Sequence, residues 1–186
     1  MLDTTVSRSQ HKTRDLVFMA FFTALIAIGA FIKVPIPICP FTLQLLFTTM
    51  AGLLLGPALG SAAVWAYIAL GLIGLPIFTM GGGPGYIFQP TFGYLIGFAL
   101  GARITGILSK GEPTMKKLLV ANFAGLMVVY LCGMVYYYII GNFVINQPIA
   151  LWPLFLYCFI LAVPGDIALC IGAALLGKKL IPLLRK

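Results

Sequence analysis

One acidic residue of this 186-residue chain, Asp166, lies inside a long apolar stretch. It follows Pro164 and Gly165, which interrupt a helix and leave backbone groups free. A carboxylate within lipid costs on the order of 3 kcal/mol or more unless it is paired or faces a cavity. Asp166 is therefore a candidate hydrogen-bond acceptor for a ligand. The alternatives are a partner for a cation of the helix bundle and a cap for the broken helix.

A second group of polar residues lies in the segment 81–94, GGGPGYIFQPTFGY. Its glycines and prolines cannot continue a helix, because glycine gains freedom on unwinding and proline lacks an N–H donor. Glycine backbone also lets a small molecule approach closely. The candidate partners for such a molecule are the backbone at Gly83 and the hydroxyl and amide groups of Tyr86, Gln89, Thr91 and Tyr94. A flexible loop between two membrane spans is the alternative interpretation.

A third group consists of Thr42 and Gln44, at the end of the proline-rich segment 35–44, PIPICPFTLQ. The prolines predict an extended loop, because proline and the residue before it both disfavour helix. The two polar side chains directly precede the next apolar run, where a loop and a helix meet. We expect them to face the same space as the glycine-rich segment.

None of these groups resembles a catalytic set. The single histidine, His11, lies in the polar N-terminal segment, which argues against catalysis or metal binding by histidine. No phosphate-binding Walker motif is present, so the chain does not drive transport by ATP hydrolysis unaided. An enzyme using Asp166 would need a second catalytic group nearby, and a purely structural subunit would leave the unusual loops without a purpose. We expect a binding protein with no metal and no cofactor.

The elements that position these residues are membrane-spanning helices. The composition is 61% hydrophobic and 9% charged, with a mean hydropathy of +1.08. A soluble domain has roughly 25% charged residues. The sequence thus predicts an all-α integral membrane protein embedded in a lipid bilayer. The net charge of +8 does not indicate a nucleic-acid partner, because cations collect between membrane spans.

The apolar runs predict six transmembrane helices in a single domain after a polar tail at 1–15. They cover about 16–34, 45–55, 61–78, 91–108, 118–140 and 149–176. Eleven of the twelve Lys and Arg residues fall in the two tails or around the connection between the fourth and fifth helices. With six helices these regions share one face, which should be cytoplasmic. Both termini are then cytoplasmic, and the three loops opposite should enclose a ligand cavity near the outer face.

The first helix carries a small-xxx-small pair, Ala20 and Ala24. Residues four apart share a helix face, and small side chains let another helix pack closely in lipid. The partner helix belongs either to the same bundle or to another protein.

Four sequence segments together resemble the BioY family: PIPICPFTLQ at 35–44, GLPIF at 74–78, GGGPGYIFQPTFGYLIGF at 81–98 and VPGD at 163–166. The resemblance extends over residues 20–179. BioY proteins are the biotin-specific substrate-binding (S) components of energy-coupling factor (ECF) vitamin transporters. The resemblance implies a six-helix protein of the prokaryotic cell membrane that binds biotin near the outer face. It also implies a shared transmembrane coupling subunit and a pair of ATPases as partners.

The resemblance further implies roles for individual residues. Asp166 would accept hydrogen bonds from the ureido N–H groups of biotin. Polar side chains for the ureido carbonyl or the valerate tail would be Thr42, Gln44 and Gln89. Tyr86 and Tyr94 would pack on the rings, while backbone N–H groups of the glycine-rich segment, Gly83 included, would meet the carboxylate. Ala20 and Ala24 would contact the coupling subunit.

One departure from the family concerns the residue three positions after PGD, which is often lysine and is Leu169 here. It leaves fewer polar contacts around Asp166. Within transport, the alternative is an S component for another small vitamin, because a fold does not fix its ligand.

Overall fold

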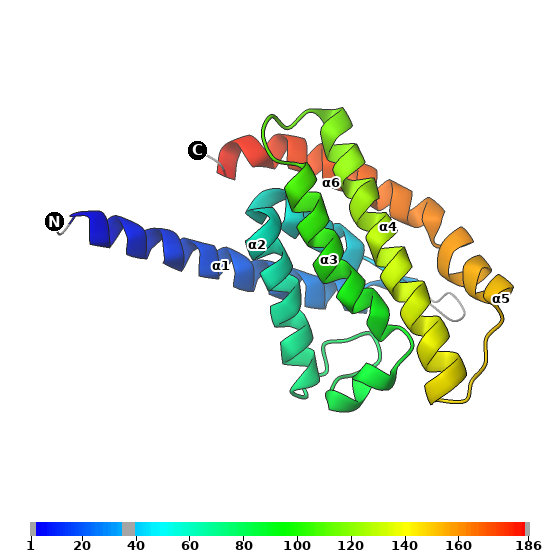
Figure 1. The fold of residues 1–186 in the computed structure, drawn as a ribbon. Helices are drawn as coiled ribbons and strands as arrows, with labels where there is room; N and C mark the ends of the chain where they lie inside the picture. Colours follow the sequence, from blue (N-terminus) through cyan, green and yellow to red (C-terminus); the bar gives the residue numbers. More distant parts are fainter. Residues whose placement is uncertain (1–2, 35–39, 185–186) are drawn as a thin grey trace.

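The computed structural model describes residues 3–34 and 40–184. Five long helices make up most of it (Figure 1): α1 Asp3–Phe31, α2 Gln44–Leu72, α3 Phe92–Leu108, α4 Met115–Ile139 and α6 Val163–Leu184. The shorter helical elements are a 3-10 helix, η1 Pro84–Phe88, the π-helices η2 Ile140–Val144 and η3 Leu156–Ile160, and α5 Leu151–Phe155. An antiparallel ribbon of β1 (Lys33–Val34) and β2 (Phe41–Thr42) lies between α1 and α2, with Lys33 opposite Thr42.

Four helical stretches of the described chain are long and apolar enough to cross a bilayer. They are Lys12–Phe31, Gln44–Leu72, Met115–Val144 and Leu151–Leu184. Helix α3 is also apolar but has only 17 residues. The chain is therefore an all-helical membrane protein apart from its short ribbon.

Helix α2 contains a break at Gly56, where φ is 81° and ψ is −178°. Pro57 follows and cannot donate to the helical ladder. Beyond the break, a Cβ on Gly60 would lie 2.6 Å from the carbonyl oxygen of Ala51. Nine residues of straight helix would separate these positions by about 13.5 Å. The chain thus changes direction sharply at Gly56, between the predicted spans 45–55 and 61–78.

Three helix boundaries differ from the predicted spans. Helix α1 begins at Asp3, inside the predicted tail, because Arg, Lys and Gln continue a helix readily. Helix α2 ends at Leu72 rather than 78, since Gly74 adopts a φ of 116° and Pro76 follows. The last predicted span is divided into α5, η3 and α6, and it continues to Leu184.

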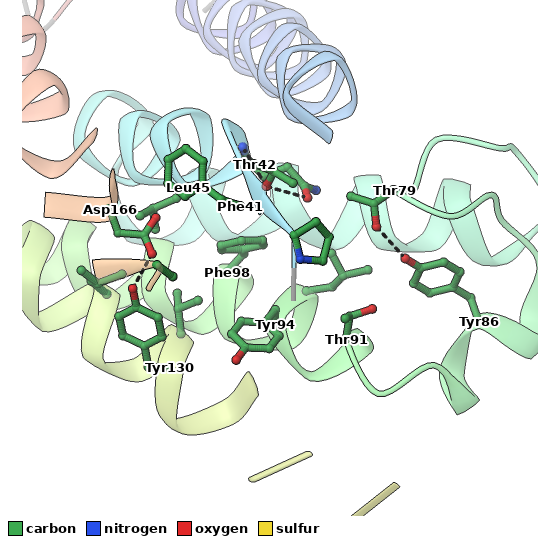
Figure 2. A pocket seen from close by; sticks show the side chains of 16 residues that line it. Phe41, Thr42, Leu45, Thr79, Tyr86, Thr91, Tyr94, Phe98, Tyr130 and Asp166 are labelled. Atoms are coloured by element: carbon green, nitrogen blue, oxygen red, sulfur yellow. Dashed lines mark hydrogen bonds between the residues drawn. The ribbon is translucent and has the colours of Figure 1, made fainter. Parts of the chain in front are cut away.

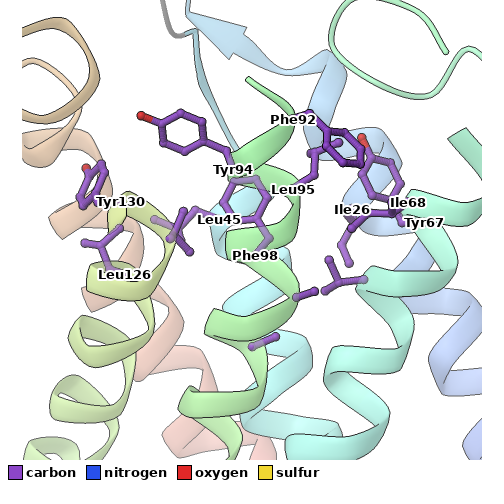
Figure 3. Packing of buried hydrophobic residues seen from close by; sticks show 14 of the residues in the cluster. Ile26, Leu45, Tyr67, Ile68, Phe92, Tyr94, Leu95, Phe98, Leu126 and Tyr130 are labelled. Atoms are coloured by element: carbon purple, nitrogen blue, oxygen red, sulfur yellow. The ribbon is translucent and has the colours of Figure 1, made fainter. Parts of the chain in front are cut away.

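Helix α3 packs between α2 and α4 (Figure 1). Close approach depends on small residues. A Cβ on Gly52 would lie 2.4 Å from the carbonyl oxygen of Ala102, and one on Gly101 would lie 2.9 Å from that of Gly125. Toward η1 the core becomes aromatic, and Figure 3 shows Tyr67, Phe92, Tyr94, Phe98 and Tyr130 among its buried side chains.

The two ends of the molecule differ in charge. In Figure 1 the start of α1, the end of α6 and the connection between α3 and α4 lie at the upper left, while η1 and α5 lie toward the lower right. Exposed basic side chains occur on the first group of segments: Lys12, Arg14, Lys110, Lys116, Lys178 and Lys179. Lys33, in β1, instead donates from Nζ to the carbonyl oxygen of Thr79, at 2.9 Å.

Candidate functional site

A narrow cavity lies between β2, α2, α3, α4 and the start of α6. Its volume is about 60 Å³, enough for a few water molecules. Figure 2 shows Asp166 and Tyr130 at one end of the cavity and Thr79 and Tyr86 at the other, with Phe98, Tyr94 and Thr42 between them. Each part is built by different elements.

The first polar end is formed by Asp166 and Tyr130. Asp166 lies in the first turn of α6, is 8% exposed, and donates its backbone N–H to the carbonyl oxygen of Ala162 at 3.0 Å. The hydroxyl of Tyr130, from α4, donates to Oδ2 of Asp166 (Figure 2). Phe41 of β2 covers Gly165, where a Cβ would come within 2.7 Å of the Phe41 ring. A glycine before Asp166 is thus required for the ribbon to pack closely over this end.

The opposite polar end is formed by hydroxyl groups from the segment after α2 and from the start of α3. The hydroxyls of Thr79 and Tyr86 are 3.0 Å apart and share a hydrogen bond (Figure 2). The Thr91 hydroxyl is buried and has no hydrogen-bond partner among the described residues. A buried hydroxyl without a partner costs free energy, so a ligand group that bonds Thr91 would recover it.

The apolar middle consists of Leu45, Tyr94, Leu95, Phe98, Leu126 and Val129. Phe98 and Tyr94 lie between the two polar ends in Figure 2. The ring of Tyr94 rests against Gly133 of α4, where a Cβ would lie 2.3 Å from its Cε1 atom. This wall can pack against an apolar ring or chain but offers it few hydrogen bonds.

Thr42 and Gln44 line the cavity between these ends, and their polar groups bond within the protein. Thr42 Oγ1 donates to Gln44 Oε1 at 3.2 Å, and Gln44 Nε2 donates to the Tyr67 hydroxyl at 3.0 Å. Gln44 is only 2% exposed. The pair therefore fixes the cavity wall where β2 passes into α2.

Six of the predicted ligand-binding residues line this one cavity: Thr42, Gln44, Tyr86, Thr91, Tyr94 and Asp166. Gly83 and Gln89 are not among its lining residues. The N–H of Gly83 donates to the carbonyl oxygen of Gly71 at 2.7 Å, so this donor is occupied by the protein. Gln89 follows η1 as its C-cap, and its N–H donates to the carbonyl oxygen of Tyr86 at 3.0 Å.

The sequence interpretation missed Tyr130, Thr79 and Phe41 as cavity residues. Tyr130 gives no signal of its own, because tyrosine is common in apolar helices and its partner lies 36 residues away. Phe41 lies within the proline-rich segment 35–44 and Thr79 lies just before the segment 81–94, so proximity was the available signal. Among the described residues, no three His, Cys, Asp or Glu side chains are close enough to hold a metal ion.

Ala20 and Ala24 are not among the residues that line the cavity, and they lie on an exposed face of α1. Large apolar side chains on the same helix are also exposed, among them Val17, Phe21 and Ile28. Within the described residues, this face of α1 is not covered by the rest of the bundle.

Comparison with known proteins identifies relatives along most of the chain. A profile described as the BioY family matches residues 4–186. A probable biotin transporter BioY of Lysinibacillus sphaericus is 45% identical over 178 residues, which cover 95% of this chain and 91% of the relative. The biotin transporter BioY of Rhizobium etli is 35% identical, covering 90% of this chain and 92% of the relative. A crystal structure of the S-component for biotin from an ECF-type ABC transporter superimposes with a TM-score of 0.78 at 30% identity, over 92% of each chain.

Proposed function

Because the chain belongs to the BioY family, we propose that it binds biotin and takes it up as the S component of an ECF-type transporter. It is a multi-pass protein of the prokaryotic cell membrane and a transporter component rather than an enzyme. The observation that carries the proposal is the division of its cavity into an acidic end, an apolar middle and a hydroxyl-lined end.

Biotin has a matching order of chemical groups. Its ureido ring carries two N–H donors, its bicycle and valerate chain are apolar, and its carboxylate is an acceptor. The Asp166 carboxylate accepts from the ureido N–H groups in a charge-assisted hydrogen bond. The rings and chain pack on Tyr94 and Phe98. The carboxylate accepts from hydroxyls at the opposite end, where Tyr86 and the unpartnered Thr91 lie.

The other predicted ligand partners have structural roles. Thr42 and Gln44 stabilise the cavity wall through hydrogen bonds within the protein. The backbone N–H groups of Gly83 and Gln89 stabilise the segment around η1. A cavity of about 60 Å³ is smaller than biotin, so its walls move apart when biotin enters.

The proposed topology has six transmembrane helices with both termini in the cytoplasm. The break at Gly56 divides α2 into two spans, 44–55 and 57–72, and this division supports the count. The exposed basic residues near both termini and between α3 and α4 support the orientation. In this topology the cavity opens toward the outer face.

The proposed partners are the ECF transmembrane coupling subunit and its pair of ATPases. Ala20 and Ala24 of α1 form the proposed contact with the coupling subunit. Their exposure and their spacing of four residues, which places them on one face of α1, support this role.

The deciding experiment is isothermal titration of biotin into the purified protein in detergent, with riboflavin and thiamine as controls. Saturable one-to-one binding of biotin alone is expected. Binding of a control vitamin instead would reassign the ligand. If folded protein gives no heat with biotin, mass spectrometry of the denatured sample distinguishes carried-over biotin from the absence of any binding.

A further inference from the structure

The hydrogen bond between Tyr130 and Asp166 joins two helices inside the cavity. Tyr130 projects from α4 and Asp166 from α6, and they are 3% and 8% exposed. We propose that Tyr130 determines the orientation of the ligand by committing its hydroxyl proton to Asp166, which makes this end of the cavity an acceptor for ligand N–H groups. This inference rests on the proposed function, and it assigns to Tyr130 the selectivity of the cavity for a ligand with N–H donors at this end.

Tyr130 and an ionised Asp166 have one hydrogen-bonding proton between them. A phenol hydroxyl has one proton to donate and a lone pair that accepts, while an ionised carboxylate only accepts. With the Tyr130 proton directed at Oδ2 of Asp166, both side chains present lone pairs to the cavity. A ligand carboxylate at this end meets acceptors and is disfavoured, whereas an N–H group finds a partner.

The opposite end has the complementary character. The hydroxyls of Thr79 and Tyr86 share one hydrogen bond, so one of them keeps its proton for a ligand, and the Thr91 hydroxyl can also rotate to donate. A ligand with donors at one end and a carboxylate at the other therefore enters with its donors toward α6. The cavity sets this orientation by the direction of its hydrogen bonds.

Tyr130 is held in place independently of the ligand. Its ring makes an edge contact with Phe159 of η3, with ring centres 4.9 Å apart. Two turns earlier on α4, Asn122 Nδ2 donates to the carbonyl oxygen of Cys170 at 2.8 Å, one turn after Asp166 on α6. This second bond fixes the register of α4 against α6. The hydroxyl is thus directed at the carboxylate before a ligand arrives.

The test is Tyr130→Phe, which removes only the hydroxyl, measured by titration with biotin and with a biotin derivative methylated on one ureido nitrogen. Biotin affinity is expected to fall about tenfold or more, as for other hydrogen bonds to charged groups. The preference of the wild-type protein for biotin over the methylated derivative is expected to shrink. The matched control is Tyr138→Phe, also on α4 but not among the lining residues, which should leave both values unchanged.

A double-mutant cycle distinguishes loss of the hydrogen bond between Tyr130 and Asp166 from a change in packing caused by Tyr130→Phe. In an Asp166→Ala background, Tyr130→Phe should cause no further loss of biotin affinity. An equal loss in both backgrounds, or wild-type affinity and preference in Tyr130→Phe, would overturn the inference. If the single variant does not fold, the comparison is made between Asp166→Ala and Asp166→Ala/Tyr130→Phe alone, where equal affinities support the inference and a tenfold difference contradicts it. Failure of the wild-type protein to bind biotin would instead reject the proposed function.

Discussion

Gln44 donates a hydrogen bond from Nε2 to the hydroxyl oxygen of Tyr67, at 3.0 Å, so its amide is bonded to the protein rather than free for a ligand. The Tyr67 hydroxyl in turn donates to the carbonyl oxygen of Ile77, also at 3.0 Å. Because Thr42 bonds Gln44 Oε1, this chain of hydrogen bonds connects β2 with the segment that follows α2. The buried side chain of Tyr67 thereby connects two walls of the cavity by hydrogen bonds.

We expect Tyr67→Phe to lower the stability of the ligand-free protein by about 1–3 kcal/mol, because it leaves the buried Gln44 amide and the partly buried Ile77 carbonyl without a partner. The midpoint of thermal unfolding in detergent, followed by near-ultraviolet circular dichroism, measures this loss. The matched control is Tyr157→Phe in η3, a partly exposed phenol. Equal midpoints for Tyr67→Phe and the wild-type protein would show that this chain of hydrogen bonds contributes nothing to stability.

The packing of the Tyr94 ring against Gly133 gives a prediction about the shape of the cavity. In Gly133→Ala the new Cβ would lie 2.3 Å from the Tyr94 ring, so either the ring moves into the cavity or α3 and α4 separate. Overpacking of this kind costs typically 1–3 kcal/mol, and biotin affinity should fall roughly tenfold or more. Isothermal titration measures the change.

Gly172→Ala is the control for that substitution, because an added Cβ on Gly172 meets no atom within 4 Å. It should bind biotin as the wild-type protein does. If both alanine variants bind equally well, Tyr94 does not shape the ligand-binding space.

The charge of Asp166 gives a prediction about ligand chemistry. Asp166→Asn keeps the size of the side chain but loses the negative charge, and biotin affinity should fall at least about tenfold. The loss should be larger for 2-iminobiotin, whose protonated guanidinium replaces the neutral urea and forms an ion pair with a carboxylate. Titration of both ligands at neutral pH compares the two losses. Equal and small losses would mean that Asp166 does not meet the head group.

The residues that the sequence identified are those whose type is unusual for their surroundings. Asp166 stands out as a carboxylate in an apolar run, and glycines and prolines mark the segments around Thr42 and Tyr86. The break at Gly56 was predictable for the same reason. Each of these positions has a local signal that does not depend on distant parts of the chain.

The residues that the sequence did not identify depend on packing between helices. Tyr130 belongs to the cavity only because α4 lies beside α6, and tyrosine in an apolar helix is more often a core residue. Gly83 and Gln89 were predicted with Tyr86, but the 3-10 helix between them directs Tyr86 into the cavity and leaves the other two outside its walls. Which residue of a polar segment faces a ligand therefore depends on a turn that composition does not specify.

The exposed face of α1 gives the prediction about assembly. Ala24→Trp adds a large ring beside Ala20, where close packing of another helix requires small side chains. We expect this variant to lose co-purification with the coupling subunit and its ATPases while its biotin affinity stays at the wild-type value, because Ala24 is not among the residues that line the cavity. Ala69→Trp, at an exposed alanine of α2, is the matched control and should retain the complex. An intact complex with Ala24→Trp would exclude this face as the contact, and loss of biotin binding would show that the substitution disturbs the fold rather than the interface.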